Sequence, residues 1–474
     1  MNGAARLRRA LILSIKDQGS TESRPTRFMG SSHGFPTAHR SHEHPPHPPF
    51  EHPLPPRRGR GTGCTAIELS PAAGPPWQAP NLNPNRNLAR LRFLEIKSKI
   101  TIKIGKFTIN FRSVSDSRFT WRVIDSDEKL AGLLPRVQAA DWLALDTEAD
   151  SLHAYPEKLC LIQISLPGAD ELIDTLAALD LSAFLDVLRG RELILHGADY
   201  DLRLLRRAYA FVPKPVFDTM LAARLLGFTE FGLTHLVEKL LGVQLEKGPQ
   251  TADWARRPLT ERMINYARND TRYLQPLSAL LKARLEEKGR LSWHQESCAR
   301  LVRECAELRV TDPDQVWRVK GADKLDRRGL AVLRELWNWR DGEAMEANKP
   351  PYFILRHETL IALADAAAQG KTVSPLLPPG LPSRRREGVL AGVERASQLP
   401  ASQWPQRHRS SGQRPSAAEK RRYDVLRQRR DHRAAELGID PTLIASRATL
   451  GALARDWDTH QAELMSWQRE LLQI

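Results

Sequence analysis

The chain has 474 residues, enough for roughly two to four domains with hydrophobic cores of their own. No apolar run approaches the roughly 20 residues of a membrane-spanning helix, and the four cysteines lack the CxxC spacing of a zinc site or a disulfide framework, so we expect a cytoplasmic protein without membrane contact. The net charge of +15 is concentrated in residues 1–120 and 384–433. Such basic segments can bind phosphate backbones, but they can equally be solvated tails.

Residues 1–115 are predicted to be a disordered, basic extension rich in Pro and His. The first 16 residues fit either a targeting peptide or a start codon assigned too far upstream. Within the extension, Ile and Lys alternate over residues 100–104, which indicates either a strand or a basic tail.

Ordered structure is predicted from about residue 121, where apolar runs and helical periodicities begin to alternate. We expect a mixed sheet flanked by helices over residues 121–290. The predicted elements, in chain order, are a helix over 128–138, a strand ending at Asp146, two further strands over 159–164 and 171–173 that complete an antiparallel meander, a helix over 179–189, a strand over 193–196, a helix opening at Asp199, and helices over 216–226, 232–241 and 260–285.

The first candidate site residues end a strand. The apolar run 142–145 leads directly into Asp146, Thr147 and Glu148, and residues two apart in a strand share one face. Carboxylates beside a core usually have a compensating partner such as a metal. Taken alone, the triplet is better explained by a strand that runs out into solvent.

Two later helices carry further candidates. Asp201 lies at the start of a helix that follows a strand, and Tyr266 and Asp270 share one helical face at i and i+4. Taken alone, the second pair fits an ordinary amphipathic helix. Together with Asp146 and Glu148, however, these positions could bring four carboxylates to one point. Because they could not stay ionised without cations, the pattern predicts two divalent metals and phosphodiester chemistry.

At these residues the chain resembles the ribonuclease D family, within the class of 3′→5′ exonucleases built on four acidic residues and a tyrosine. The similarity extends to Asp253-Trp254 and to Arg257-Pro258. The matching site segments are Leu145-Asp146-Thr147-Glu148, His196-Gly197-Ala198-Asp199-Tyr200-Asp201-Leu202 and Tyr266-Ala267-Arg268-Asn269-Asp270.

The resemblance implies a ribonuclease H-like α/β exonuclease domain over residues 121–290. It also implies that Asp146, Glu148, Asp201 and Asp270 hold two Mg²⁺ or Mn²⁺ ions, with Asp146 shared between them, and that Tyr266 orients the attacking water. The implied reaction trims RNA from its 3′ end, including tRNA precursors and other structured RNA, and releases nucleoside 5′-monophosphates. Asp199 could be mistaken for Asp201, but Leu202 and Leu205 fit the family's helix.

The C-terminal part contains a repeat. Blocks near 332–340 recur 93 positions later and blocks near 351–364 recur 90 positions later, which suggests a three-residue deletion between them. Residues 325–403 resemble an HRDC domain, an all-α module associated with nucleic-acid contact, and residues 416–474 resemble a degenerate second copy. Trp337 and Trp339 are expected in the core, while residues 384–386 and 420–433 are candidates for phosphate contacts or simply solvated helix.

Three alternatives compete with an exoribonuclease. A DNA-directed exonuclease fits the same metal site, and a non-catalytic RNA-binding scaffold would be expected to lose the carboxylates, all of which are present. A helicase is rejected because the Gly370-Lys371-Thr372 run lacks the glycine five positions earlier, where Asp365 stands, and follows a helix rather than a strand. The sequence leaves the oligomeric state open, with a monomer as the working expectation.

Overall fold

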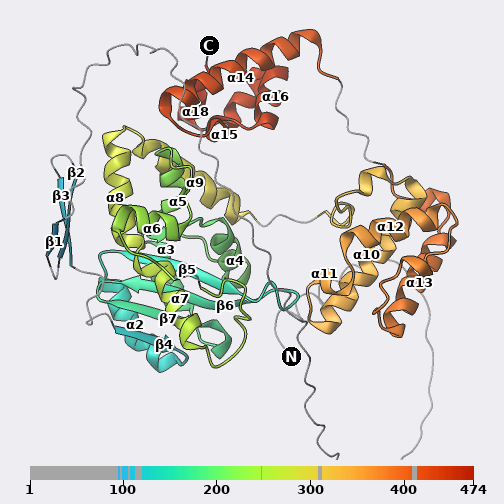
Figure 1. The fold of residues 1–474 in the computed structure, drawn as a ribbon, viewed down its shortest axis with the longest axis horizontal. Helices are drawn as coiled ribbons and strands as arrows, with labels where there is room; N and C mark the ends of the chain where they lie inside the picture. Colours follow the sequence, from blue (N-terminus) through green and yellow to red (C-terminus); the bar gives the residue numbers. More distant parts are fainter. Residues whose placement is uncertain are drawn as a thin grey trace, which may run out of the picture. The chain divides into compact units, whose positions relative to one another are not determined.

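The computed structural model describes residues 94–96, 99–104, 107–112, 120–246, 248–307, 312–407 and 414–473 (Figure 1). Across these ranges no helix combines the length and apolarity that crossing a membrane requires. The fold consists of two sheets and a series of helices, and the larger sheet positions the candidate site.

A small antiparallel sheet forms within the predicted N-terminal extension. Its strands are β1 (Leu94–Ile96), β2 (Lys99–Ile104) and β3 (Phe107–Arg112), in that order across the sheet. The prediction of disorder is wrong for these strands, because the Ile/Lys alternation in β2 has the two-residue period of a strand. The rest of the extension, including the first 16 residues, lies outside the described residues.

The larger sheet has six strands in the order β4-β7-β6-β5-β8-β9. β5, β6 and β7 pair antiparallel, as the predicted meander requires, whereas β4 with β7, β5 with β8, and β8 with β9 pair parallel. The mixed sheet is therefore confirmed. Its strands are β4 (Thr120–Ile124), β5 (Leu143–Ala149), β6 (Leu159–Leu166), β7 (Ala169–Asp174), β8 (Leu193–Leu195) and β9 (Val216–Asp218).

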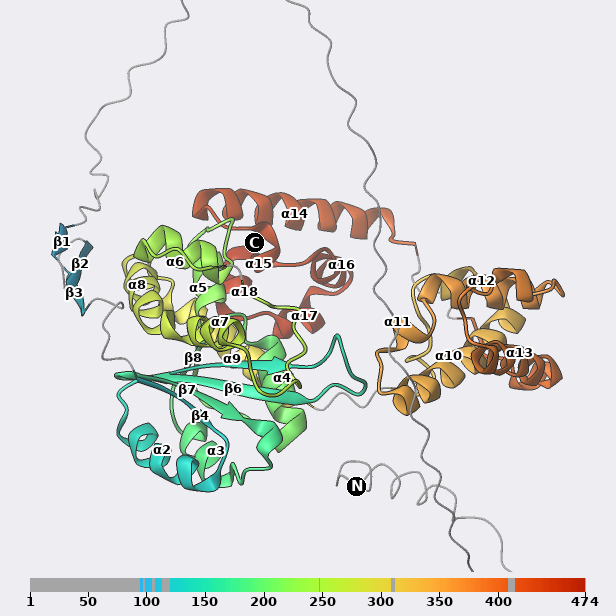
Figure 2. The same ribbon diagram turned by 60° about the horizontal axis from the view of Figure 1, so that its bottom comes forward.

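Helices cover both faces of this sheet. Figure 2 shows α2 and α3 on one face and α7 on the other. α7 packs across β5, β6 and β7. The helices of this domain are α2 (Asp127–Ala139), α3 (Ser182–Arg189), α4 (Asp199–Tyr209), α5 (Thr219–Leu225), α6 (Leu233–Leu241), α7 (Glu261–Arg272), α8 (Leu274–Glu287) and α9 (Leu291–Ala306).

Two predicted helices are divided differently in the structure. The helix predicted over 216–226 begins as β9, because Val216 and Phe217 are an apolar pair that joins the sheet beside β8. Asp218 then caps α5 by accepting from the amides of Met220 and Leu221. The helix predicted over 260–285 is broken at Tyr273, which separates α7 from α8.

The C-terminal part is entirely helical where the structure describes it. The first helical unit comprises α10 (Arg327–Ala347), α11 (Pro351–Ile354), α12 (His357–Ala368) and α13 (Ser383–Gln398). The second comprises α14 (Ala417–Leu437), α15 (Pro441–Ile444), α16 (Arg447–Arg455), α17 (Trp457–His460) and α18 (Ser466–Leu472).

The two helical units repeat with a single offset of 90 residues, so the predicted change of offset is wrong. α10 and α14 both have 21 residues, and their N-caps are Asp326 and Ser416. Buried Arg340 donates from Nη1 to the Leu355 carbonyl, and buried Arg430 donates to the Ala445 carbonyl, each at 3.1 Å. The 93-residue match came from similar Val-Leu-Arg triplets that do not occupy equivalent positions.

Several basic and aromatic side chains of the first helical unit have partners within it. Trp337 and Trp339 are half-buried against its core. Arg384 pairs with Glu343 and Glu346, and Arg385 also pairs with Glu343. Arg386 donates to the carbonyls of residues 378, 379 and 381. The arginine run therefore already has partners within the chain, which weakens its case as a phosphate-binding patch.

Candidate active site

β5 delivers two carboxylates to one face of the sheet. Leu143 and Leu145 point into the core shared with α2 and α3, whereas Ala144 packs on the opposite face against Leu274, the first residue of α8. Because side chains alternate along a strand, Asp146 and Glu148 follow Ala144 onto the face that α7 covers.

α7 brings Asp270 to these two residues. Asp146, Glu148 and Asp270 each offer a carboxylate oxygen, and these oxygens lie within 4.8 Å of one another. Tyr266 lies one turn earlier on α7, and its side chain lies beside Asp270, where it opposes the rise in the pKa of that carboxyl group. The i and i+4 spacing thus places the phenol beside the carboxylate cluster, as the sequence predicted.

Asp201, at the start of α4, lies close enough to the cluster that its charge raises the pKa values of Asp146, Glu148 and Asp270. Its side chain is buried, and its Oδ1 accepts a hydrogen bond from the Thr147 hydroxyl, which points away from the face of Asp146 and Glu148. Asp199, the other sequence candidate, is 58% exposed and pairs with Arg203 along the helix. The structure thus brings Asp201 to the cluster and turns Asp199 outward.

Asp218 is a buried supporting residue that the sequence reasoning did not single out. Its carboxylate accepts from the backbone amides of Gly197 and Ala198 at 3.1 and 2.9 Å, and these residues form the turn that precedes α4. It therefore helps fix where Asp201 begins its helix. An aspartate between an apolar strand and a helix is an N-cap pattern, which was the available signal. His196 lies in the same turn, within 2.9 Å of the Thr219 hydroxyl, as expected for a structural histidine.

The four carboxyl groups oppose one another's ionisation. Burial, then the charges of Asp270 and Asp201, raises the pKa of Glu148 to about 9. Burial is also the main cause that raises the pKa of Asp270 to about 8 and that of Asp201 to about 6. The pKa of Asp146 is raised by burial and by the other three carboxylates.

This arrangement fits hard divalent cations. Every donor in the cluster is a carboxylate oxygen, which is the ligand type that Mg²⁺ and Mn²⁺ prefer. Oδ2 of Asp270 is buried and has no hydrogen-bond partner among the described residues. A cation would satisfy this oxygen and relieve the mutual repulsion that raises the pKa values.

Comparisons with known proteins agree with this fold and site. A family model described as 3′-5′ exonuclease matches residues 121–286, and an HRDC domain model matches residues 329–371. The fold and the carboxylate cluster thus define the class of protein as a 3′→5′ exonuclease.

Relatives along most of the chain narrow this class to a family. Ribonuclease D of Granulibacter bethesdensis is 31% identical over 371 residues, covering 75% of this chain and 92% of that protein. Ribonuclease D of Gluconacetobacter diazotrophicus is 32% identical over 364 residues, covering 73% and 89%. The crystal structure of Escherichia coli RNase D matches with a TM-score of 0.59 and 28% identity, covering 75% of this chain and 99% of that one. The chain belongs to the ribonuclease D family of 3′→5′ exoribonucleases.

Proposed function

We propose that this enzyme removes nucleotides one at a time from the 3′ end of RNA and releases nucleoside 5′-monophosphates. The observation that carries the proposal is the carboxylate cluster: oxygens of Asp146, Glu148 and Asp270 lie within 4.8 Å of one another, and the charge of Asp201 also raises the pKa of Asp146. Structural carboxylates are normally paired with cations of the protein, so a cluster of this kind is suited to binding metal ions and phosphate together.

In this proposal Asp146, Glu148, Asp201 and Asp270 would hold two Mg²⁺ or Mn²⁺ ions. When bound, such ions lower the pKa of a water molecule and stabilise the charge that develops on the scissile phosphate. The Tyr266 phenol, one helical turn before Asp270 and beside it, orients the attacking water. The Thr147 hydroxyl holds one Asp201 oxygen and leaves the other available as a ligand.

The proposed substrates are tRNA precursors and other structured RNAs with accessible 3′ ends. The support comes from the family, since the Escherichia coli relative is described as an exoribonuclease involved in structured RNA processing. We also propose that residues 416–474 are a degenerate second HRDC-like copy. The shared 90-residue offset and the equivalent Arg340 and Arg430 hydrogen bonds support this proposal.

The test is a time course on 5′-labelled single-stranded RNA with Mg²⁺ or Mn²⁺, beside a 3′-phosphate-blocked copy and the DNA equivalent. We expect a metal-dependent ladder that shortens from the 3′ end, with the blocked RNA protected. Asp201→Asn should abolish the ladder. Asp199→Asn is the matched control, because it changes an exposed carboxylate two residues away that forms an ion pair with Arg203 along the helix surface.

Two outcomes would contradict the proposal. Full activity of Asp201→Asn would show that the site is wrong. RNA binding without cleavage by the unaltered protein would favour a binding scaffold. A DNA ladder that runs faster than the RNA ladder would instead assign the same site to DNA.

A further inference from the structure

The chain between α6 and α7 wraps around the Tyr266 ring. Trp254 is 1% exposed, and its ring centroid lies 6.1 Å from that of Tyr266 in a tilted packing. The Gln250 side chain lies beside the Tyr266 phenol, where it opposes the rise in the pKa of Tyr266 that burial causes. Residues 248–257, hereafter the wrapping segment, therefore contact the aromatic ring and its hydroxyl.

Gly248 brings the backbone of the wrapping segment directly against this ring. A Cβ at position 248 would lie 1.5 Å from Cδ2 of Tyr266, far inside van der Waals contact. Only glycine lets the chain pass this close without displacing the ring. The orientation of Tyr266 thus depends on where the wrapping segment is held.

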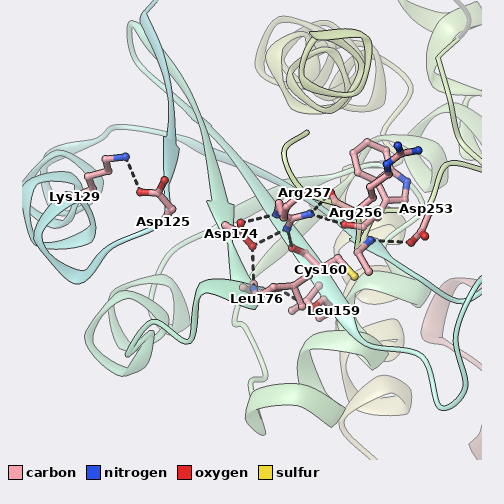
Figure 3. Close-up of polar contacts among 12 residues, drawn as sticks. Asp125, Lys129, Leu159, Cys160, Asp174, Leu176, Asp253, Arg256 and Arg257 are labelled. Carbon is pink, nitrogen blue, oxygen red and sulfur yellow. Dashed lines mark hydrogen bonds and ion pairs between the residues drawn. The ribbon is translucent and has the colours of Figure 1, made fainter. Parts of the chain in front are cut away.

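Arg257 anchors the wrapping segment to the sheet. Its Nε and Nη2 donate to the two carboxylate oxygens of Asp174, each at 2.6 Å, and Nη2 also donates to the Cys160 carbonyl at 3.0 Å (Figure 3). Its Nη1 donates to the Trp254 carbonyl at 2.7 Å. One planar guanidinium therefore ties the backbone of Trp254 to the ends of β6 and β7.

Both sides of this anchor are constrained. Asp174 ends β7, and its Oδ1 also accepts from the Leu176 amide at 3.0 Å. The bidentate pair is largely shielded, with 27% of the Arg257 side chain and 10% of the Asp174 side chain exposed. A bidentate guanidinium–carboxylate pair fixes the relative orientation of its two side chains, whereas a lysine ammonium does not.

We propose that Arg257 and Asp174 are positioning residues for Tyr266. They hold the wrapping segment in the one place where Gly248, Gln250 and Trp254 set the orientation of the phenol. The inference rests on the proposed role of Tyr266 in orienting the attacking water. Arg257 acts through the wrapping segment, so its contribution to the rate exists only while the phenol is present.

A double-mutant cycle on the full-length protein tests this dependence. Arg257→Lys keeps the charge but loses the bidentate pair. We expect it to lower kcat about 10-fold, with KM for single-stranded RNA and the Mn²⁺ concentration for half-maximal rate changed less than about 3-fold. In the Tyr266→Phe background the same substitution should lower kcat by less than about 2-fold.

Matched controls separate positioning from general stability. Arg136→Lys changes the arginine that pairs with Glu171 of β7. It should change kcat by the same factor in the unaltered protein and in the Tyr266→Phe background. Arg256→Lys changes the exposed neighbour of Arg257 and should leave kcat unchanged. Gly248→Ala alters no ion pair and provides a second route, because its Cβ must move the ring. It too should lower kcat only while the hydroxyl is present.

The outcomes distinguish the two proposals. If Arg257→Lys and Gly248→Ala each lower kcat by the same factor with Tyr266 present as in the Tyr266→Phe background, the positioning role is overturned, while the exonuclease activity stands. Full activity of Tyr266→Phe would overturn the role of Tyr266 and the positioning role with it. Absence of metal-dependent cleavage by the unaltered protein would overturn the proposed function itself.

Discussion

Two groups of carboxyl groups, one buried and one partly buried, lie at the same sheet, and they differ in what faces them. On β7, Glu171 pairs with Arg136 at 2.6 Å, and Asp174 pairs with Arg257 at 2.6 Å. At the end of β5 and on α7, Asp146, Glu148 and Asp270 chiefly face one another. Burying a charge costs several kcal/mol unless it is compensated, so the first group is compensated by the chain and the second requires something added.

Burial alone therefore does not identify the site. Asp170 on β7 is buried, and burial raises its pKa as it does for the site residues. In this case, however, the Ser165 hydroxyl and the charges of Arg272 and Arg268 oppose the rise. A structural carboxylate differs from a metal-binding one in the charge of the neighbouring groups, which is positive around the first and negative around the second.

The sharpest test of this comparison removes a charge from the uncompensated group. Asp146→Asn should lower kcat at least about 1,000-fold, because the proposed ligand shared by the two metals is lost. The same change should not lower the free energy of unfolding of the metal-free protein, since it relieves repulsion. Single-turnover cleavage and urea unfolding measure the two effects. A marked loss of stability would place Asp146 with the structural group.

The converse substitution acts on the compensated group. Glu171→Gln removes the carboxylate that pairs with Arg136 and Arg122, and it should destabilise the fold by about 1 to 2 kcal/mol because both arginines are partly solvated. The kcat of the folded fraction should change less than about 3-fold, because this carboxyl group lies outside the carboxylate cluster of the candidate site. Urea unfolding followed by activity at matched folded fraction gives both values. A loss of kcat comparable to that of Asp146→Asn would erase the distinction.

Tyr266→Phe should have an intermediate effect that is confined to the rate. Loss of the hydroxyl should lower kcat about 10- to 100-fold, within the range expected for a group that positions a reacting water. Metal affinity, measured by calorimetric titration with Mn²⁺, should change less than about 3-fold because all four carboxylates remain. Weakened metal binding would show that the phenol instead supports the ligands.

The structure brings together carboxylates that sequence spacing had placed on shared faces. A strand period places Asp146 and Glu148 on one face, and a helical turn places Tyr266 above Asp270. Sequence spacing did not reveal the hydrogen bonds of Asp218 to residues 197 and 198 or those of Arg257 to Asp174 and Cys160, since these partners are distant in sequence. Long-range hydrogen bonds to main-chain groups leave no local periodicity.

The errors in the fold have similar causes. Val216 and Phe217 join β8 across the sheet, and a local apolar pair cannot show that it pairs with a distant strand. The predicted offset of 93 residues is wrong because it aligns the two Val-Leu-Arg triplets. The structurally equivalent residues are the buried Arg340 and Arg430, each of which donates to a carbonyl 15 residues later. Tertiary contacts decided both cases.

The smallest expected effect is a pH dependence of stability in the metal-free protein. Burial and the neighbouring carboxylates raise the pKa of Glu148 to about 9, above the roughly 4.3 of an unfolded glutamate. The folded state therefore holds a proton that the unfolded state has released, so this group favours folding least at high pH, and stability falls as pH rises from about 5 to 9.

Glu148→Gln removes this titration and isolates its contribution. The difference in Tm between the unaltered protein and Glu148→Gln, measured in EDTA, should grow by a few degrees in favour of the variant between pH 6 and pH 8.5. Saturating Mg²⁺ should reverse the difference, because the ion stabilises the ionised carboxylate and only the unaltered protein keeps the full ligand set. A difference in Tm independent of both pH and Mg²⁺ would show that Glu148 is compensated in the folded chain, as the carboxylates of β7 are.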